Sequence, residues 1–408
     1  MRIAYLCADL GIPLFGSKGA SVHVRELVRA FSSFGHEVRV LTPRAGGEPA
    51  REFPADVVEI RPDRRDEGVC ELLRSDPGAG PVAARDVRAL LYSTTFGRRA
   101  LELLDDFRPE LVYERYSLFG TAGREVASAC GAPLVVEVNA PLVDEQAEHR
   151  GLVLERTARA MERDVLLAAD RIVTVSTALR DWLVELGVDT GRIEVLANGV
   201  DVERFEAAGA ERARMRARLG GDRELFVGFV GSLKPWHDVA LLVEAVARLR
   251  RQGRRARLVV IGEGPQLEAL EHAAREARVA ATFTGAVPHE RVPACLAALD
   301  VAVAPYAPTG RFYFSPLKLV EYMAAGLPTV AADVGDLGRC IQPGETGWLY
   351  RPGDVGELTR TIARIAEDGA SAARVAAAGR EHVRAEHTWR GNAERIVHLV
   401  AAVGSAAR

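Results

Sequence analysis

Short, uninterrupted apolar segments alternate with amphipathic helical segments along almost the whole chain of 408 residues. Ile3–Cys7 is the first apolar segment, and Val38–Leu41 follows it after a helical stretch. In that stretch, apolar residues recur with the i, i+3, i+4, i+7 spacing of one helix face, from Val24 to Phe31. Further strand-like segments are Leu111–Tyr113, Leu134–Val138 and Ile172–Val175. Strands that are apolar throughout and separated by helices are typical of parallel sheets covered on both faces.

The same alternation begins again at Leu225–Val230, which is followed by Gly231 and a second amphipathic helix. The later strand-like segments are Leu258–Ile261, Thr282–Thr284, Val301–Ala304 and Thr329–Ala331. The pattern predicts an α/β chain of two doubly wound, Rossmann-like domains in tandem, joined near residues 186–201. Residues 368–384 and 392–403 are predicted to be helical.

Three segments depart from this regular pattern. Residues 44–84 are rich in glycine, proline and charge and predict a long loop with one strand at Val57–Ile60, whereas residues 143–167 predict one long helix. Six arginines between Arg248 and Arg257 fall at a helix end and the turn after it, where positive charge suits the helix dipole. They predict a solvated basic face, and a patch for a membrane surface or an acidic partner is the alternative.

Charge and cysteine content exclude several classes of protein. Lys and Arg number 53 against 56 Asp and Glu, a net charge of −3, and such a chain without a basic tail is a poor nucleic-acid binder. No apolar run approaches the roughly 18 to 20 residues of a membrane span, and the first residues predict a buried strand rather than a signal peptide. The five scattered cysteines form no C-x-x-C pair, which predicts idle thiols in a reducing cytosol.

Two common nucleotide-binding motifs do not match the sequence. The first strand-end loop does not read G-x-G-x-x-G, and Leu267 stands where a third glycine would follow Gly262 and Gly264, which argues against NAD binding. The glycine-rich loop that begins at Gly16 has its lysine, Lys18, one residue late for a P-loop. A nucleoside triphosphatase is therefore not predicted.

The sequence also offers no evident metal-ligand set. No D-x-D motif occurs, and His382 and His387 lie five residues apart, which does not place them on one face of a helix. We therefore expect no metal and no resident cofactor in the reaction.

Both domains nevertheless carry loops suited to anions after their strands, where helix N-termini and the carboxyl ends of parallel strands meet. In the first domain this loop is Gly16–Ser21. In the second domain, three segments converge: Gly231–Asp238 with one lysine and one histidine, Gly262–Pro265, and Ser315–Pro328 with Glu321. A fixed cation stabilises a diphosphate leaving group, and a carboxylate such as Glu321 can accept two hydroxyl hydrogen bonds from a ribose.

These segments resemble the retaining GT-B glycosyltransferases of glycosyltransferase family 4 over nearly the whole chain. The most specific matching strings are VIGEGP and SPLKLVEYMAAGLPTVA, supported by GSKGASVHVRELVRAFSSFGHEVRVLTP, LANGVD, FVGSLKPWHDVALLVEAV and a short HTW near the end. The resemblance implies an acceptor domain at residues 1–188, a nucleotide-sugar domain at 189–388, and a terminal helix at 389–408 that crosses back onto the first domain, with Trp389 near the crossing.

The resemblance also implies roles for individual residues. Glu321 matches the second Glu of the family's E-x(7)-E motif, which holds the ribose, and Asn139 lies where many relatives carry a His near the transferred sugar. The residues expected to bind the donor are Gly16, Ser17, Lys18, Gly19, Ser232, His237, Gly262, Val287, Tyr313, Ser315, Pro316, Leu317, Lys318 and Glu321. Those expected to act in catalysis are Lys234, Asn139 and Glu321, and those expected near the acceptor are Tyr116, Glu137 and Asn139.

The chain departs from the family pattern at three places. Tyr313 replaces the first Glu of E-x(7)-E, Asn139 replaces the usual His, and Ser232 and His237 stand where the pattern G-R-x(4)-K-G has its two cations. We expect Lys234, Lys318 and His237 to supply the missing positive charge. The chain therefore represents a variant branch of the family.

The resulting hypothesis is a metal-independent glycosyltransferase that moves a sugar from a nucleotide-diphosphate sugar, with a slight preference for a UDP-sugar, and retains the anomeric configuration. The domains are expected to close on the donor, and the departing phosphate to help deprotonate the acceptor. The alternatives are a catalytically inactive partner or scaffold of the same fold and a sugar-nucleotide epimerase. We expect a cytoplasmic monomer or homodimer without nucleic-acid partners, and the sequence leaves room for peripheral membrane contact.

Overall fold

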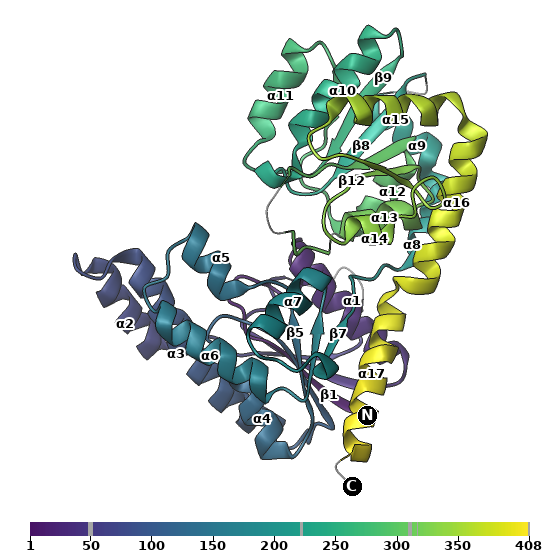
Figure 1. The fold of residues 1–408 in the computed structure, drawn as a ribbon. Helices are drawn as coiled ribbons and strands as arrows, with labels where there is room; N and C mark the ends of the chain where they lie inside the picture. Colours follow the sequence, from purple (N-terminus) through teal and green to yellow (C-terminus); the bar gives the residue numbers. More distant parts are fainter. Residues whose placement is uncertain (48–51, 221–222, 309–311, 316, 407–408) are drawn as a thin grey trace. The chain divides into compact units, whose positions relative to one another are not determined.

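The computed structural model describes residues 1–47, 52–220, 223–308, 312–315 and 317–406, which form two compact units (Figure 1). Unit 1 comprises residues 1–197 together with the terminal segment from Trp389, and unit 2 comprises Asn198–Thr388. Both units are α/β, as the alternating pattern predicts. The boundary lies nine residues beyond the predicted one, because residues 193–195 form a strand of the first sheet.

Unit 1 contains a seven-stranded parallel sheet in the order β3-β2-β1-β4-β5-β6-β7. The strands are β1 (Arg2–Cys7), β2 (Glu37–Thr42), β3 (Asp56–Glu59), β4 (Leu111–Arg115), β5 (Leu134–Val138), β6 (Arg171–Thr174) and β7 (Ile193–Val195). The helices are α1 (Gly19–Ser33), α2 (Arg64–Ser75), α3 (Gly80–Leu104), α4 (Ala122–Cys130), α5 (Leu142–His149), α6 (Glu155–Ala168), α7 (Thr177–Glu185) and α17 (Trp389–Ala406). Helix α17 packs against α1 within this unit (Figure 1).

Unit 2 contains a six-stranded parallel sheet in the order β10-β9-β8-β11-β12-β13. Its strands are β8 (Leu225–Val230), β9 (Ala256–Ile261), β10 (Ala280–Phe283), β11 (Val301–Ala304), β12 (Thr329–Ala332) and β13 (Trp348–Tyr350). Its helices are α8 (Val202–Ala207), α9 (Arg212–Leu219), α10 (Val239–Arg251), α11 (Leu267–Glu276), α12 (Val292–Ala297), α13 (Leu317–Ala324), α14 (Leu337–Cys340), α15 (Val355–Glu367) and α16 (Gly369–Glu386).

The strand order of each unit reverses beside its first strand. In unit 1 the chain continues from β3 across to β4 on the other side of β1, and in unit 2 it continues from β10 to β11 on the other side of β8. Ligands of doubly wound folds bind outside the carboxyl ends of the strands at this switch point. The topology therefore predicts ligand sites at the loops after β1 and β8.

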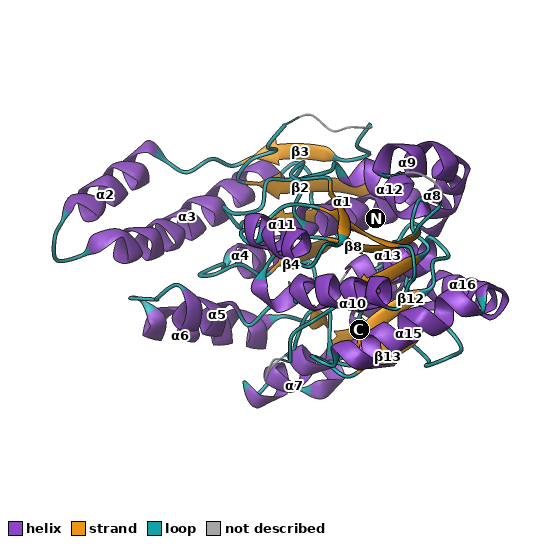
Figure 2. Cartoon of the chain, turned by 90° about the horizontal axis from the view of Figure 1, so that it is seen from above, coloured by secondary structure: helices purple, strands orange, loops and turns teal. Residues whose placement is uncertain are grey.

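Two predictions about secondary structure are wrong. Residues 44–84 contain not only strand β3 but also α2 and the start of α3, which Figure 2 shows as two helices. Asp63 caps the N-terminus of α2 by accepting a hydrogen bond from the backbone N–H of Arg65. The charged composition of the segment did not indicate this helix. Residues 143–167 are not one helix, because the chain leaves α5 at Arg150 and passes through Gly151, whose φ is 73°, before α6.

His382 and His387 lie close together, although their spacing does not place them on one face of a helix. Helix α16 ends at Glu386, and His387 has φ −128° and ψ 54°, so it does not continue the helical path. The two imidazole rings lie 5.5 Å apart between centroids as a result. Helical spacing rules apply only inside a helix, and His387 lies just beyond one.

No helix among the described residues has the length and apolarity that crossing a membrane requires.

A buried hydroxyl ties α13 to the central strand of unit 2. The backbone N–H of Val230 donates to the Tyr322 hydroxyl at 2.7 Å, and the Tyr322 side chain is fully buried. Tyr322→Phe removes the acceptor without changing the shape of the ring, and we expect it to lower the free energy of unfolding by about 1–3 kcal/mol.

Tyr5→Phe is the matched control for this prediction. The Tyr5 hydroxyl is also buried but has no hydrogen-bond partner among the described side chains and backbone groups. Urea unfolding should therefore show little loss for Tyr5→Phe, and equal losses in the two variants would contradict the role of the Tyr322 hydroxyl.

Candidate functional site

The loops after β8, β9 and β10 are fastened to one another by their backbones. Gly231 N–H donates to Ile261 O at 3.0 Å, Leu233 N–H to Glu263 O at 2.9 Å, and Gly262 N–H to Gly285 O at 3.0 Å. A Cβ on Gly262 would stand 2.1 Å from the Gly231 carbonyl oxygen, and Gly262 has φ 135°. Only glycine allows this approach, so the glycines of these loops serve first to bring the three strand ends together.

Lys318 reaches this junction from α13. Its side chain is almost fully buried, its Nζ donates to the Tyr306 hydroxyl at 3.2 Å, and a Cβ on Gly231 would meet that Nζ at 3.2 Å. The ammonium lies 4.7 Å from the Phe229 ring centroid and 4.9 Å from that of Tyr306. Burial lowers the pKa of Lys318 to about 7, although the Glu321 charge opposes the shift. Lys318 therefore places a poorly solvated ammonium beside Gly231, at the end of β8.

Glu321 lies one helical turn beyond Lys318 and is held by a residue outside the predicted site, His289. His289 Nε2 contacts Glu321 Oε1 at 2.7 Å, and both side chains are largely buried. His289 begins a short turn after β10, within the string FTGAVPHERVPACLAALDVAVAPY, and no pattern in that string distinguished it. The contact fixes the orientation of the carboxylate that was predicted to bind ribose.

His237 does not supply the charge that was expected of it. Its Nδ1 contacts the Ser232 carbonyl oxygen, and its ring packs 5.3 Å from that of Tyr306. Burial, together with the nearby Lys318 charge, lowers the pKa of His237 to about 3, so the imidazole is neutral near pH 7. Lys234 is partly exposed in the same loop, with its Nζ 5.9 Å from the Trp236 ring centroid.

The segment that leads into α13 is anchored by Asn198, the first residue of unit 2. Its backbone N–H donates to Ser315 Oγ at 2.9 Å, and its side-chain amide donates to the Ser315 carbonyl. Tyr313 packs on Phe314 with ring centroids 4.5 Å apart. Leu317 is the first residue of α13, and Val287 packs against the core of unit 2. Pro316 lies outside the described residues.

In unit 1, the predicted Gly16–Gly19 loop leads directly into α1. Lys18 precedes the helix in an extended conformation, and its Nζ donates to Gly11 O at 3.0 Å. Arg25, on α1, stabilises the loop by donating to the carbonyl oxygens of Leu14 and Gly16, each at 2.7 Å. The first N–H groups of a helix have no partner within it, so Ser17, Lys18 and Gly19 lie where an anion can be bound.

Glu137, at the end of β5, is a buried carboxylate with several donors. It accepts hydrogen bonds from Tyr113 at 2.6 Å and from Arg115 and Asn139 at 2.5 Å each, and His23 Nε2 lies 2.9 Å away. Burial would raise the pKa of Glu137, but His23 and Arg115 beside it hold that pKa well below its usual range. Glu137 therefore positions Asn139, and direct contact with an acceptor would have to displace one of these donors.

Tyr116 is also largely buried, within the core of unit 1. Its hydroxyl donates to Glu162 at 2.8 Å, and burial raises the pKa of Glu162 to about 7. The structure thus gives Tyr116 a packing role and a hydrogen bond to α6.

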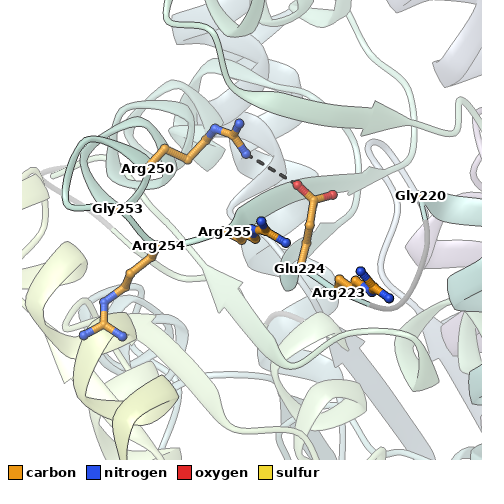
Figure 3. Close-up of a pocket in the computed structure, with 7 residues that line it drawn as sticks. All are labelled: Gly220, Arg223, Glu224, Arg250, Gly253, Arg254 and Arg255. Atoms are coloured by element: carbon orange, nitrogen blue, oxygen red, sulfur yellow. Dashed lines mark hydrogen bonds and ion pairs between the residues drawn. The ribbon is translucent and has the colours of Figure 1, made fainter.

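A hollow of about 760 Å³ lies near the amino ends of strands β8 and β9 (Figure 3). It is lined by Gly220, Arg223, Glu224, Arg250, Gly253, Arg254 and Arg255, and Glu224 and Arg255 immediately precede β8 and β9. Figure 3 shows Arg250 directed toward Glu224, 3.5 Å away. Because this hollow adjoins the amino ends of the strands, it is separate from the glycine-lined loops at their carboxyl ends.

Comparison with known proteins identifies the class of this fold and then the family. Over 98% of the chain the structure matches that of the Anabaena protein HepE in complex with UDP and glucose, with a TM-score of 0.74, 18% identity and 99% of that chain covered. It also matches sucrose-phosphate synthase from Thermosynechococcus elongatus, with a TM-score of 0.75, 22% identity and 99% of each chain covered. Two parallel sheets of this kind place the chain among the two-domain GT-B proteins.

The sequence comparisons are more specific. Residues 17–204 match the family described as Glycosyltransferase Family 4, and residues 224–368 match Glycosyl transferases group 1. Glycogen synthase from Mycobacterium tuberculosis is 30% identical over 421 residues, covering 99% of this chain and 96% of that protein. The 2-deoxystreptamine glucosyltransferase of Streptomyces kanamyceticus is 33% identical, covering 81% of this chain and 73% of its own. The chain therefore belongs to the glycosyltransferase 4 family.

The hydrogen bonds that Glu137 accepts predict how much its carboxylate contributes to the free energy of unfolding. Glu137→Gln leaves the buried Arg115 guanidinium without its carboxylate, and we expect it to cost about 3–5 kcal/mol in the free energy of unfolding. Chemical denaturation of the full chain, followed by circular dichroism, measures the change in the free energy of unfolding.

Glu114→Gln is the neighbouring control. Glu114 is equally buried, but burial raises its pKa to about 7, so its carboxyl is already partly neutral near that pH. We expect a much smaller loss from this variant, and a loss as large as that of Glu137→Gln would refute the distinction between the two carboxylates.

Proposed function

We propose that this protein transfers a glycosyl group from a nucleotide-diphosphate sugar, bound by unit 2, to an acceptor hydroxyl bound by unit 1. The transfer proceeds with retention of the anomeric configuration and without a metal ion at the diphosphate. The observation that carries the proposal is the junction of glycine-lined loops in unit 2, where the buried Lys318 and the oriented Glu321 lie one helical turn apart on α13.

The chemistry of the junction matches the two ends of a nucleoside diphosphate. The Lys318 ammonium and the partly exposed Lys234 ammonium stabilise the negative charge that grows on the departing diphosphate. Glu321, oriented by His289, accepts hydrogen bonds from the ribose hydroxyls. In this arrangement two lysines replace the charge that the usual arginine and lysine provide in the family, and His289 acts as a positioning residue.

In unit 1 we assign the acceptor side to Asn139, whereas the Gly16–Gly19 loop remains a predicted contact of the donor diphosphate. Asn139 donates to Glu137, and this bond directs the amide at the carboxyl end of β5. The departing phosphate accepts the proton of the attacking hydroxyl, so that no protein carboxylate has to act as the nucleophile. Retention of configuration follows from attack on the face that the leaving group vacates.

The named relatives support a sugar donor and suggest which acceptors to test. HepE was crystallised with UDP and glucose, which favours a UDP-sugar as the first donor to try. The relatives include a 2-deoxystreptamine glucosyltransferase and the D-inositol 3-phosphate glycosyltransferase of Streptomyces avermitilis, which is 30% identical over 89% of this chain and 79% of its own. Cyclitols and glucans are therefore the acceptor classes with which an assay begins.

A screen of UDP-, GDP-, ADP- and TDP-sugars by thermal shift tests donor binding, because a ligand at 100 times its Kd adds about 2.7 kcal/mol to stability. Glu321→Ala should weaken binding of the selected donor by roughly 10- to 150-fold, the value of a hydrogen bond to a charged group. Titration calorimetry measures the change, and the melting temperature without ligand reports whether the variant is folded.

Glu345→Ala serves as the matched control, because Glu345 is exposed. Its donor affinity should equal that of the wild-type chain. Unchanged affinity in Glu321→Ala would remove the carboxylate from the donor site.

The lowered pKa of Lys318 gives donor binding a specific pH dependence. Free protein loses this charge as pH rises through about 7, whereas a bound diphosphate favours the protonated form and raises the pKa. Affinity for UDP should therefore be greatest below pH 7 and fall by at most roughly 50-fold between pH 7 and 9.

Lys318→Gln should bind UDP weakly at every pH and show a flat profile over this range. Calorimetry at several pH values measures both proteins. A wild-type affinity that does not change from pH 7 to 9 would show that the Lys318 ammonium does not face the diphosphate.

Two other functions give different outcomes in the same assays. An inactive partner protein would bind a donor and transfer nothing across a broad acceptor panel. An epimerase would convert a UDP-sugar with no acceptor present. NMR of the glycoside product tests retention directly, because a product of inverted configuration excludes it.

A further inference from the structure

We propose that Cys340, His382 and His387 form a zinc site in unit 2, separate from the donor site. The three residues come from two helices: Cys340 is the last residue of α14, His382 lies within α16, and His387 caps the C-terminus of α16. One possible ligand atom from each residue lies within 4.8 Å of the others. Lys318 and Glu321, by contrast, lie on α13, and neither is part of this cluster.

The spacing of these atoms suits a tetrahedral ion. Cys340 Sγ lies 3.7 Å from His387 Nε2. Bond lengths of about 2.3 Å for Zn–S and 2.0–2.1 Å for Zn–N, at a tetrahedral angle, place a sulfur and a nitrogen about 3.5 Å apart. Cys340 and His387 therefore already have nearly the separation that zinc requires between two of its ligands.

His382 supplies a second, independent observation. Its Nε2 is buried and has no hydrogen-bond partner among the described residues, and its ring packs edge-on against that of His387 with an interplanar angle of 69°. A buried nitrogen without a partner loses the hydrogen bonds that water would give it. Coordination of a metal satisfies that nitrogen.

The chemistry of the three ligands favours zinc. One thiolate and two imidazoles form a borderline-soft set, which suits zinc better than magnesium or calcium, because those ions prefer oxygen ligands. Three protein ligands leave the fourth tetrahedral position to a water molecule or another outside ligand.

The place of the cluster in the fold indicates a structural role. His387 O accepts a hydrogen bond at 2.9 Å from the N–H of Val200, and Val200 and Thr388 form a bridge. These are the segments through which the chain enters and leaves unit 2. A zinc ion bound to Cys340 would fasten α14 to the exit segment and stabilise this edge of the unit.

Cobalt titration tests the site on the full chain, purified without an affinity tag and freed of metal with a chelator. We expect one Co²⁺ per chain, visible absorption typical of tetrahedral cobalt, a thiolate-to-cobalt charge-transfer band in the near ultraviolet, and loss of both on addition of Zn²⁺. Cys340→Ala should abolish the charge-transfer band, and His382→Ala should weaken cobalt binding by more than about tenfold.

Cys130→Ala and His272→Ala are the matched controls, because both side chains are exposed and lie outside the cluster. Their spectra should equal that of the wild-type chain. Zn²⁺ should raise the melting temperature of the wild type and of both controls but not of Cys340→Ala.

The proposal is overturned if stoichiometric Co²⁺ gives no tetrahedral spectrum or if the charge-transfer band persists in Cys340→Ala. If Cys340→Ala does not fold, His382→Ala decides the question, because unchanged cobalt affinity in that variant excludes the site. These readouts do not depend on glycosyl transfer, so they remain informative whatever reaction unit 2 supports.

Discussion

The contact between the Gly231 carbonyl and Gly262 is the constraint on which the donor side of unit 2 depends. A Cβ at Gly262 would lie 2.1 Å from that oxygen, so any other residue would force the ends of β8 and β9 apart. With the two loops together, backbone hydrogen bonds join them to each other and to the turn after β10, and Lys318 reaches this junction from α13. The close approach of two backbones thus determines where a charge can be placed.

The two units place buried charge in different ways. In unit 1, Glu137 is fully satisfied by neighbouring donors, so its negative charge is compensated within the protein. In unit 2, Lys318 has mainly aromatic rings and a hydroxyl around it, and burial lowers its pKa to about 7. A compensated charge favours a positioning role, whereas a charge with little compensation favours a ligand of opposite sign.

Much of this arrangement was accessible from the sequence because it depends on local pattern. Apolar strands such as Leu134–Val138 and glycines at strand ends predicted two doubly wound sheets, and the string around Lys318 and Glu321 indicated the family. His289 was not accessible, because a histidine in a turn carries no periodic signal and its contact with Glu321 spans 32 residues. The neutral state of His237 was not accessible either, because it results from burial, which is a property of the assembled unit.

The sequence by itself determined the alternation of strands and helices in two doubly wound sheets, the glycines at the strand ends, and the presence of Lys318 and Glu321 one helical turn apart. These follow from backbone sterics and from periodicity, which act between near neighbours in the chain. Only the tertiary structure decided which charges are compensated, as at Glu137, and that Cys340 meets two histidines at the end of α16. Desolvation and contact between distant segments arise when the chain packs, and no local pattern records them.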